Sequence, residues 1–201
     1  MGIFDFLKRK ENNINKTEKE PIKCNELGEY LITFSDFTEK NHSSVVLKNP
    51  NISSEFEKEF SHLIVGEPMI KGEIISLKYY SVFINIWEQN VEVIFDAENE
   101  NLDIFIEKIN LQINWLSENR NYLNENLTQN LLNLKNENWL DKNELTKSKT
   151  EFLKQISLKS INFTQSSAFS LNFDDGNLFN GHSIEVKLNS KREIKKVSIE
   201  G

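Results

Sequence analysis

Residues that cross-link chains, bind metals or cradle phosphates are scarce in this sequence. Among 201 residues there are one cysteine, seven glycines, three prolines and three histidines. A lone Cys24 excludes an intramolecular disulfide, and His42, His62 and His182 lie too far apart for a zinc-ligand spacing. No glycine-rich phosphate loop, no G-x-S-x-G and no H-E-x-x-H motif is present. We therefore expect no metal and no cofactor.

Long apolar runs and an excess of positive charge are missing as well. No run approaches the roughly 20 apolar residues that cross a bilayer, so we expect no transmembrane segment. The start, MGIFDFLKRK, lacks the pattern of a signal peptide, and the cytoplasm is the expected location. The net charge is −7, whereas nucleic-acid binders carry a basic patch. We expect no nucleic acid but a protein partner, one with a basic surface.

What is present suffices for a folded core. Hydrophobic residues make up 38% of the chain and include 14 phenylalanines. Residues 1–26 combine a short amphipathic start with a polar stretch, and they are predicted to form a flexible tail. We expect residues 27–201 to form a single domain, with a β-rich N-terminal portion over 27–90.

Apolar alternation in the N-terminal portion predicts strands. It favours a strand over 29–35, a polar turn over 36–43 and a second strand at 45–49. Helical spacing predicts a helix over 53–64. The segments 79–87 and 91–95 are predicted to form a hairpin joined at Glu88, Gln89 and Asn90.

The middle of the chain has helical periodicity. A helix over 101–118, capped by Asn99 or Asn101, is predicted to be buried on two faces. One face carries Leu102, Phe105, Ile109, Ile113 and Leu116, and the other carries Ile104, Leu111 and Trp115. A second helix over 121–137 has a stripe of Leu123, Leu127, Leu131 and Leu134. A short helix capped by Thr146 or Ser148 follows, with Phe152 and Ile156 facing inward.

The end of the chain returns to strands. Residues 158–163, 169–173, 183–188 and 194–199 are predicted to form an antiparallel meander. Because strands precede and follow the helices without regular alternation, the sequence indicates an α+β fold. In this fold, antiparallel hairpins and the C-terminal meander pack against a central helical pair.

The stretch from 91 to 201 contains residues in a specific order. A strand leads into the helical pair, a tryptophan and a short helix, and an Asp-Asp-Gly, Leu-Phe, Gly-His hairpin follows. In this order it resembles the bacterial domain-of-unknown-function family 2262. The matching positions are Trp139, Phe152, Asp174, Asp175, Gly176, Leu178, Phe179, Gly181 and His182. Asn180 stands where such sequences often carry an aromatic. The resemblance implies a fold and no activity.

One loop, 174–182, gathers polar and conformationally special residues. If the loop folds back, Asp174 or Asp175 would form an acid–base pair or part of a metal site with His182. The alternative, which we favour, is a turn in which Gly176 supplies a positive φ and Asp175 caps the backbone. The spacing does not fit a calcium-binding loop.

Three functional hypotheses remain from the sequence. The first is a non-enzymatic protein-binding domain, an immunity-type inhibitor of a bacterial toxin, with Trp139, Phe179, Asn180 and Asp175 as interaction candidates. The alternative is a small hydrolase-like or metal-dependent enzyme that uses Asp174, Asp175 and His182. The third is an accessory domain whose amphipathic start docks on a membrane or a larger assembly.

Overall fold

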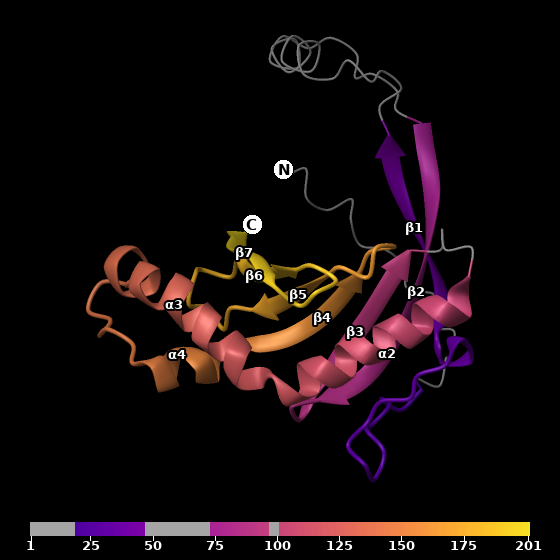
Figure 1. Cartoon of the computed structure of the whole chain (residues 1–201). Helices are drawn as coiled ribbons and strands as arrows, with labels where there is room; N and C mark the ends of the chain where they lie inside the picture. The colour runs from indigo at the N-terminus through magenta and orange to yellow at the C-terminus, as the bar shows by residue number, and fades with distance from the viewer. Residues whose placement is uncertain (1–18, 47–72, 97–100) are drawn as a thin grey trace, which may run out of the picture.

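The strands form one sheet in which neighbours along the chain are also neighbours in space (Figure 1). This computed structural model describes residues 19–46, 73–96 and 101–201. The seven-stranded sheet has the order β1-β2-β3-β4-β5-β6-β7, and every neighbouring pair is antiparallel except β3 and β4, which run parallel. The strands are β1 (Thr38–Val46), β2 (Glu73–Ile86), β3 (Gln89–Asp96), β4 (Ser157–Phe163), β5 (Phe169–Asp174), β6 (Ser183–Leu188) and β7 (Ile194–Glu200).

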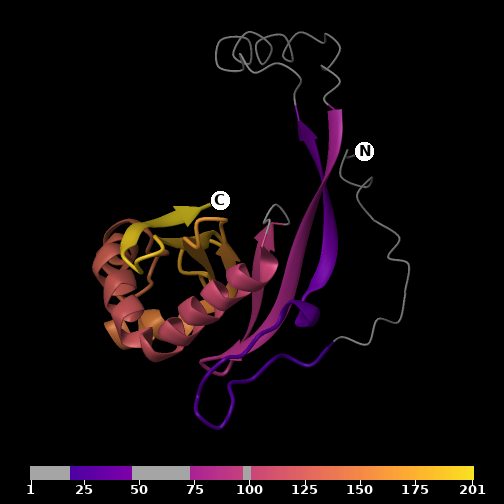
Figure 2. The same cartoon turned by 45° about the vertical axis from the view of Figure 1, so that its right-hand side comes forward.

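The helices form the crossover that the parallel pair requires. They are α2 (Leu102–Glu118), α3 (Arg120–Asn138) and α4 (Lys149–Gln155). Asn101 caps α2 by accepting a hydrogen bond from the backbone of Ile104, and Ser148 caps α4 in a capping box with Glu151. Figures 1 and 2 show the helices on one face of a curved sheet. The predicted α+β fold is confirmed.

The predicted hairpin and the predicted C-terminal meander are also confirmed. The strands β2 and β3 form a hairpin whose connection is one residue earlier than expected, at Trp87 and Glu88. Both residues have positive φ angles, 53° and 64°, the conformation that two-residue hairpins with right-handed twist require. The strands β4 to β7 form the expected antiparallel meander.

The predicted strand over 29–35 does not form, although the predicted alternation of buried and exposed side chains is present at Tyr30, Leu31 and Ile32. Tyr30 and Ile32 are buried, while Leu31 between them is 67% exposed. Their backbone amides donate to helix side chains, with 2.6 Å from Tyr30 N to Asn114 Oδ1 and 2.9 Å from Ile32 N to Asn110 Oδ1. The side-chain amides of the same two asparagines donate back to the carbonyls of Tyr30 and Ile32. Asparagines of α2 therefore satisfy this backbone in place of a neighbouring strand.

We call residues 25–33 the strap. It leads through a 3-10 turn (Phe34–Asp36) into β1, which occupies most of the segment predicted to be a turn. The misprediction arises because β1 lies at the edge of the sheet, where polar and charged residues are common in strands. The predicted helix at 53–64 and the amphipathic start at 1–10 lie outside the described residues.

The chain joins the sheet before residue 27, within the predicted flexible tail. Ile22 forms a parallel bridge with Ile84 of β2, and two hydrogen bonds hold it there. They run from Ile22 N to Phe83 O at 2.9 Å and from Asn85 N to Ile22 O at 2.8 Å. The fold thus begins by Ile22, inside the segment predicted to be a flexible tail.

The core lies between the sheet and one side of the helices. The inner face of α2 buries Phe105, Ile109, Ile113 and Leu116, each worth about 1.5–3 kcal/mol by removal from water. The predicted burial of the second face is wrong, because Ile104 is 50% and Leu111 is 61% exposed, and Trp115 is half-buried. The helices form a single layer, and in the described ranges only the strap and Arg192 cover part of the outer side of α2.

Candidate functional site

The loop between β5 and β6 contains the sequence-predicted site residues. Asp174 of β5 and Ser183 of β6 are the last paired residues of the two strands before the loop. Four loop residues have positive φ angles, Gly176 (57°), Asn177 (65°), Asn180 (56°) and Gly181 (82°). Glycine and asparagine adopt this left-handed conformation most readily. The sequence of the loop therefore matches the backbone path that it follows.

Asp175 lies at the centre of this loop and is almost completely buried. Its carboxylate accepts three backbone hydrogen bonds: Oδ1 from Asn177 N at 3.0 Å, and Oδ2 from Phe179 N at 2.6 Å and from Gly181 N at 3.2 Å. Charge-assisted bonds of this kind are roughly twice as strong as neutral ones. Asp175 thus organises the loop from within.

Asp174 and His182 enter separate hydrogen-bond networks. Asp174 is exposed, accepts from Gly176 N at 2.9 Å through Oδ1, and lies 3.9 Å from the Lys159 ammonium. His182 Nδ1 is 2.6 Å from Phe179 O and must donate, because a carbonyl oxygen only accepts. No hydrogen bond or ion pair of the described chain joins His182 to either aspartate. The structure does not bring the three together as an acid–base group.

The predicted interaction candidates divide into buried and accessible residues. Phe179 is fully buried and belongs to the core, so it cannot anchor a partner. Trp139 is half-buried, and its ring packs edge-on against Phe179 at 5.6 Å and against His182 at 5.5 Å between centroids. Asn180 is exposed at the turn. Aromatic contacts therefore fix the loop on the end of α3, and Asp175 is hidden beneath it.

A buried ion pair holds the segment after α3, and the sequence reasoning did not identify it. Lys135 is almost fully buried, and its ammonium donates to Trp139 O at 2.6 Å and to Glu144 Oε2 at 2.8 Å. The hydrogen bond from Lys135, the backbone amide of Asp141 and the Lys147 ammonium lower the pKa of Glu144 to about 2. The signal was the four-residue spacing from Leu131, which places Lys135 on the buried stripe.

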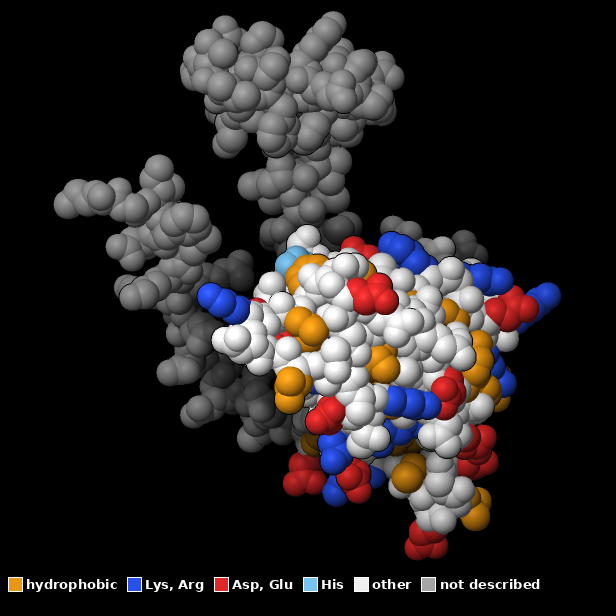
Figure 3. Space-filling view, turned by 90° about the vertical axis from the view of Figure 1, so that its left-hand side faces the viewer, with side chains coloured by type: hydrophobic (Ala, Val, Ile, Leu, Met, Phe, Trp, Pro, Cys, Tyr) orange, Lys and Arg blue, Asp and Glu red, His pale blue; other side chains and the backbone are white. Residues whose placement is uncertain are grey.

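No cluster within the described ranges is suited to a metal. No group of three or more His, Cys, Asp or Glu side chains comes together there. Cys24 is exposed on the segment that precedes the strap. Among the described helices, none is long and apolar enough to cross a bilayer. On the face made by α3 and α4, charges of both signs are interspersed with uncharged polar side chains (Figure 3).

The exposed side of α2 and the adjoining strap form a surface of a different kind. We define the α2 surface by three exposed apolar side chains and the carboxylates beside them. The apolar residues are Leu31 of the strap with Ile104 and Leu111 of α2; the acidic residues are Glu29, Asp103, Glu107 and Glu118.

Helical spacing places these residues next to one another. Glu107 is four residues from Leu111 and three from Ile104, and residues at these spacings are neighbours on a helix. Asn114, one of the two asparagines that bind the strap, is three residues from Leu111. Trp115 extends the apolar row, and the Arg192 guanidinium lies 5.6 Å over its ring. Apolar and acidic side chains therefore share one surface.

Comparison with known proteins gives a family and no activity. Residues 72–199, more than half of the chain, match a family described as an uncharacterized protein conserved in bacteria, DUF2262. The match begins earlier than the resemblance noted from the sequence, so it includes β2. No curated protein and no solved structure matches the chain significantly.

Proposed function

Because this chain belongs to DUF2262, whose description names no activity, we propose a function from the molecular surface: a non-enzymatic domain that binds a basic protein through the α2 surface. The observation that carries the proposal is the exposed second apolar face of α2. Ile104 and Leu111, on one helix, remain half or more exposed, and Leu31 is exposed on the strap that is hydrogen-bonded to that helix.

Single exposed apolar residues are ordinary, whereas a group on one element favours an interface. Two of the three project from the same helix seven residues apart, and the third comes from a segment hydrogen-bonded to that helix. This rigid setting reduces the conformational entropy that a partner must remove on binding. A binding surface on α2 would therefore be preorganised.

The charges beside these apolar residues determine the kind of partner that we propose. Asp103, Glu107 and Glu118 project from α2. The cations beside them are Lys108 on that helix and Arg192, which lies over Trp115. Glu29 adds a further carboxylate from the strap. Such a surface attracts a partner that presents lysine or arginine side chains around an apolar centre, and this attraction weakens as salt is added.

An immunity-type inhibitor of a bacterial toxin is the form of this function that we favour. A toxin that acts on nucleic acid needs a basic surface to approach phosphates, and an acidic inhibitor would cover that surface. The loop at 174–182 supports a binding role over the enzymatic alternative. Its buried aspartate is held by backbone amides, its histidine is held through Nδ1 by the carbonyl of Phe179, and no hydrogen bond in the described chain joins the two side chains.

The test compares two substitutions of the same kind at two exposed leucines. Leu111→Asp changes the α2 surface, and Leu145→Asp is the matched control on the segment after α3, where the side chain is 84% exposed. The tagged wild type captures partners from a lysate of its bacterial host at low and high salt. The captured protein is then purified, and its affinity is measured for all three chains.

The proposal predicts a basic protein whose affinity falls with salt and is unchanged by Leu145→Asp. Leu111→Asp should weaken binding about 30-fold, the loss that corresponds to roughly 2 kcal/mol at an interface hot spot. Equal affinity of the two variants, or a partner whose binding is insensitive to salt, would refute the proposal. Unchanged thermal unfolding of Leu111→Asp confirms that any loss comes from the surface.

A further inference from the structure

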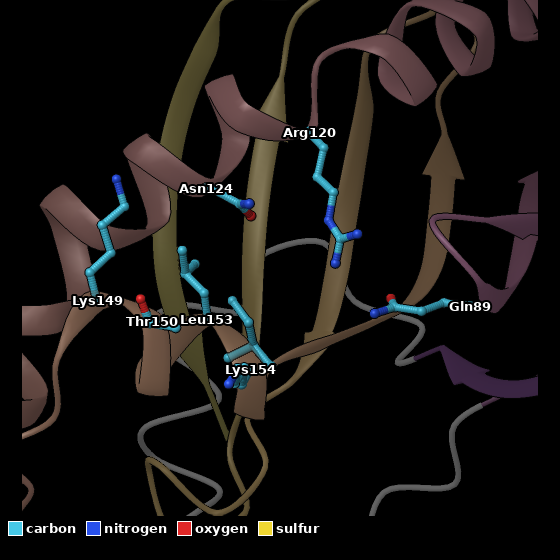
Figure 4. A pocket seen from close by; sticks show the side chains of 8 residues that line it. Gln89, Arg120, Asn124, Lys149, Thr150, Leu153 and Lys154 are labelled. Carbon is cyan, nitrogen blue, oxygen red and sulfur yellow. The ribbon is translucent and has the colours of Figure 1, made fainter.

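A hollow beside α3 and α4 combines three cations with neutral hydrogen-bond donors. It has a volume of about 430 Å³ and lies between α3, α4 and the start of β3. Arg120 from the start of α3 and Lys149 and Lys154 from α4 line it, and Figure 4 shows Arg120 reaching down toward the gap between the two helices. Among the described residues no carboxylate lines the hollow, although that of Glu125 pairs with the lining residue Lys149. This is a local positive site on a chain of net charge −7.

The cations of this site are held in different ways. The Arg120 guanidinium lies 5.5 Å over the Trp87 ring, a cation–π contact that orients it. Lys149 pairs with Glu125 of α3. Among the described residues, neither Arg120 nor Lys154 has a carboxylate within 4 Å of its charged group. Two cations of the site thus have no ion-pair partner in this part of the chain.

Neutral donors lie between the cations. Asn124 and Thr150 line the hollow with a side-chain amide and a hydroxyl. The Gln89 oxygen accepts a hydrogen bond from Leu158 N at 2.8 Å, which leaves its NH₂ group to face a ligand. Arginine, lysine, amide and hydroxyl donors together suit a phosphate, which offers several acceptor oxygens and a charge near −2.

We propose that this hollow, the α3–α4 pocket, binds the phosphate group of a small organic phosphate. Its volume falls in the range of about 300–1,000 Å³ that is typical of small-molecule sites. Leu153 and Ile156 supply apolar wall for the organic part of the ligand. The inference is independent of protein binding through α2, since the two sites share no residue.

Isothermal titration with adenosine monophosphate, adenosine and inorganic phosphate tests the pocket. Adenosine monophosphate should bind saturably and more tightly than inorganic phosphate, and adenosine should bind at least about tenfold more weakly than its monophosphate. Arg120→Gln and Lys154→Gln should each weaken binding at least about tenfold, because each removes a charge-assisted hydrogen bond. Lys159→Gln is the control, since it removes the same charge at an exposed position of β4 outside the pocket.

Tryptophan fluorescence provides a second measurement, because a ligand on Arg120 changes the environment of the adjoining Trp87. The signal should change in the wild type and in Lys159→Gln but not in Arg120→Gln. The proposal is overturned if neither phosphate compound saturates, if adenosine binds as well as its monophosphate, or if Lys159→Gln weakens binding as much as Lys154→Gln. Thermal unfolding of each variant should match the wild type, because both pocket cations are exposed.

Discussion

Replacing Asp175 with asparagine distinguishes a loop organised by its aspartate from a loop kept for catalysis. The carboxylate accepts three backbone hydrogen bonds, one through Oδ1 and two through Oδ2. In Asp175→Asn, the amide oxygen can take the Oδ2 position and keep the bonds from Phe179 and Gly181, now without the help of a charge. The new NH₂ group then faces the backbone amide of Asn177, which is a donor itself. One bond is lost and one buried donor is left without an acceptor.

The expected loss follows from that bond and from the lost charge. A hydrogen bond to a charged group contributes about 1.5–3 kcal/mol, so Asp175→Asn should lower the free energy of unfolding by at least about 1.5–3 kcal/mol. Because single domains are stable by roughly 5–15 kcal/mol, the variant should fold but unfold at much lower denaturant. Asp174→Asn is the control, since its one bond, from Gly176, can pass to the asparagine oxygen. A change within about 0.5 kcal/mol is expected there.

Urea unfolding followed by tryptophan fluorescence measures both variants, and Trp139 reports on the loop through its contact with Phe179. The difference in midpoint multiplied by the common m-value gives the change in unfolding free energy. If Asp175→Asn and Asp174→Asn unfold at the same urea concentration, the carboxylate does not organise the loop. A catalytic role for Asp175 would then regain support.

Three further perturbations test the hydrogen bonds and backbone conformations of the fold. The pKa of Glu144 is lowered from 4.5 to about 2, so the stability that its charge contributes is complete above pH 4.5 and is lost as the pH falls toward 2. Glu144→Gln should therefore flatten the dependence of the melting temperature on pH between these values. An unchanged dependence would contradict the ion pair with Lys135. Gly181→Ala should lower the free energy of unfolding by about 1–2 kcal/mol, because alanine disfavours the positive φ at this position. Gly176→Ala should lower it further, because its Cβ would also lie 2.3 Å from the backbone oxygen of Gln155 in α4. Equal urea midpoints for the two variants would refute this difference. Asn114→Ala removes two hydrogen bonds to the strap. It should therefore speed amide hydrogen exchange in the strap and lower the free energy of unfolding by about 1–3 kcal/mol. Unaltered exchange would show that these two bonds do not hold the strap on α2.

Local patterns predicted much of the fold because they act over short stretches of chain. The periodicity of Phe105, Ile109 and Ile113 located α2 and its buried side, and Ser148 marked the start of α4. Alternating residues located the strands of the meander within about one residue. Most of the edge strand β1 was predicted to be a turn, and only its last two residues fall in the strand predicted at 45–49, because an edge strand does not need the apolar alternation on which the prediction relied.

The candidate sites were predicted less completely, since each depends on residues distant in sequence. The loop at 174–182 was located correctly, and the turn interpretation matches its hydrogen bonds. The sequence did not indicate that Ile104 and Leu111 would remain exposed. Apolar spacing shows that a helix has two apolar faces but not how many layers cover it.

The sequence by itself determined the α+β class, the positions of the described helices and of most described strands, and the turn chemistry of the β5–β6 loop. Each depends on interactions between residues a few positions apart, where side-chain type decides backbone conformation. Only the tertiary structure decided that α2 asparagines hold the strap and that Arg120 and Lys154 line one pocket. Those contacts join segments separated by tens of residues, and their geometry exists only after the helices have packed on the sheet.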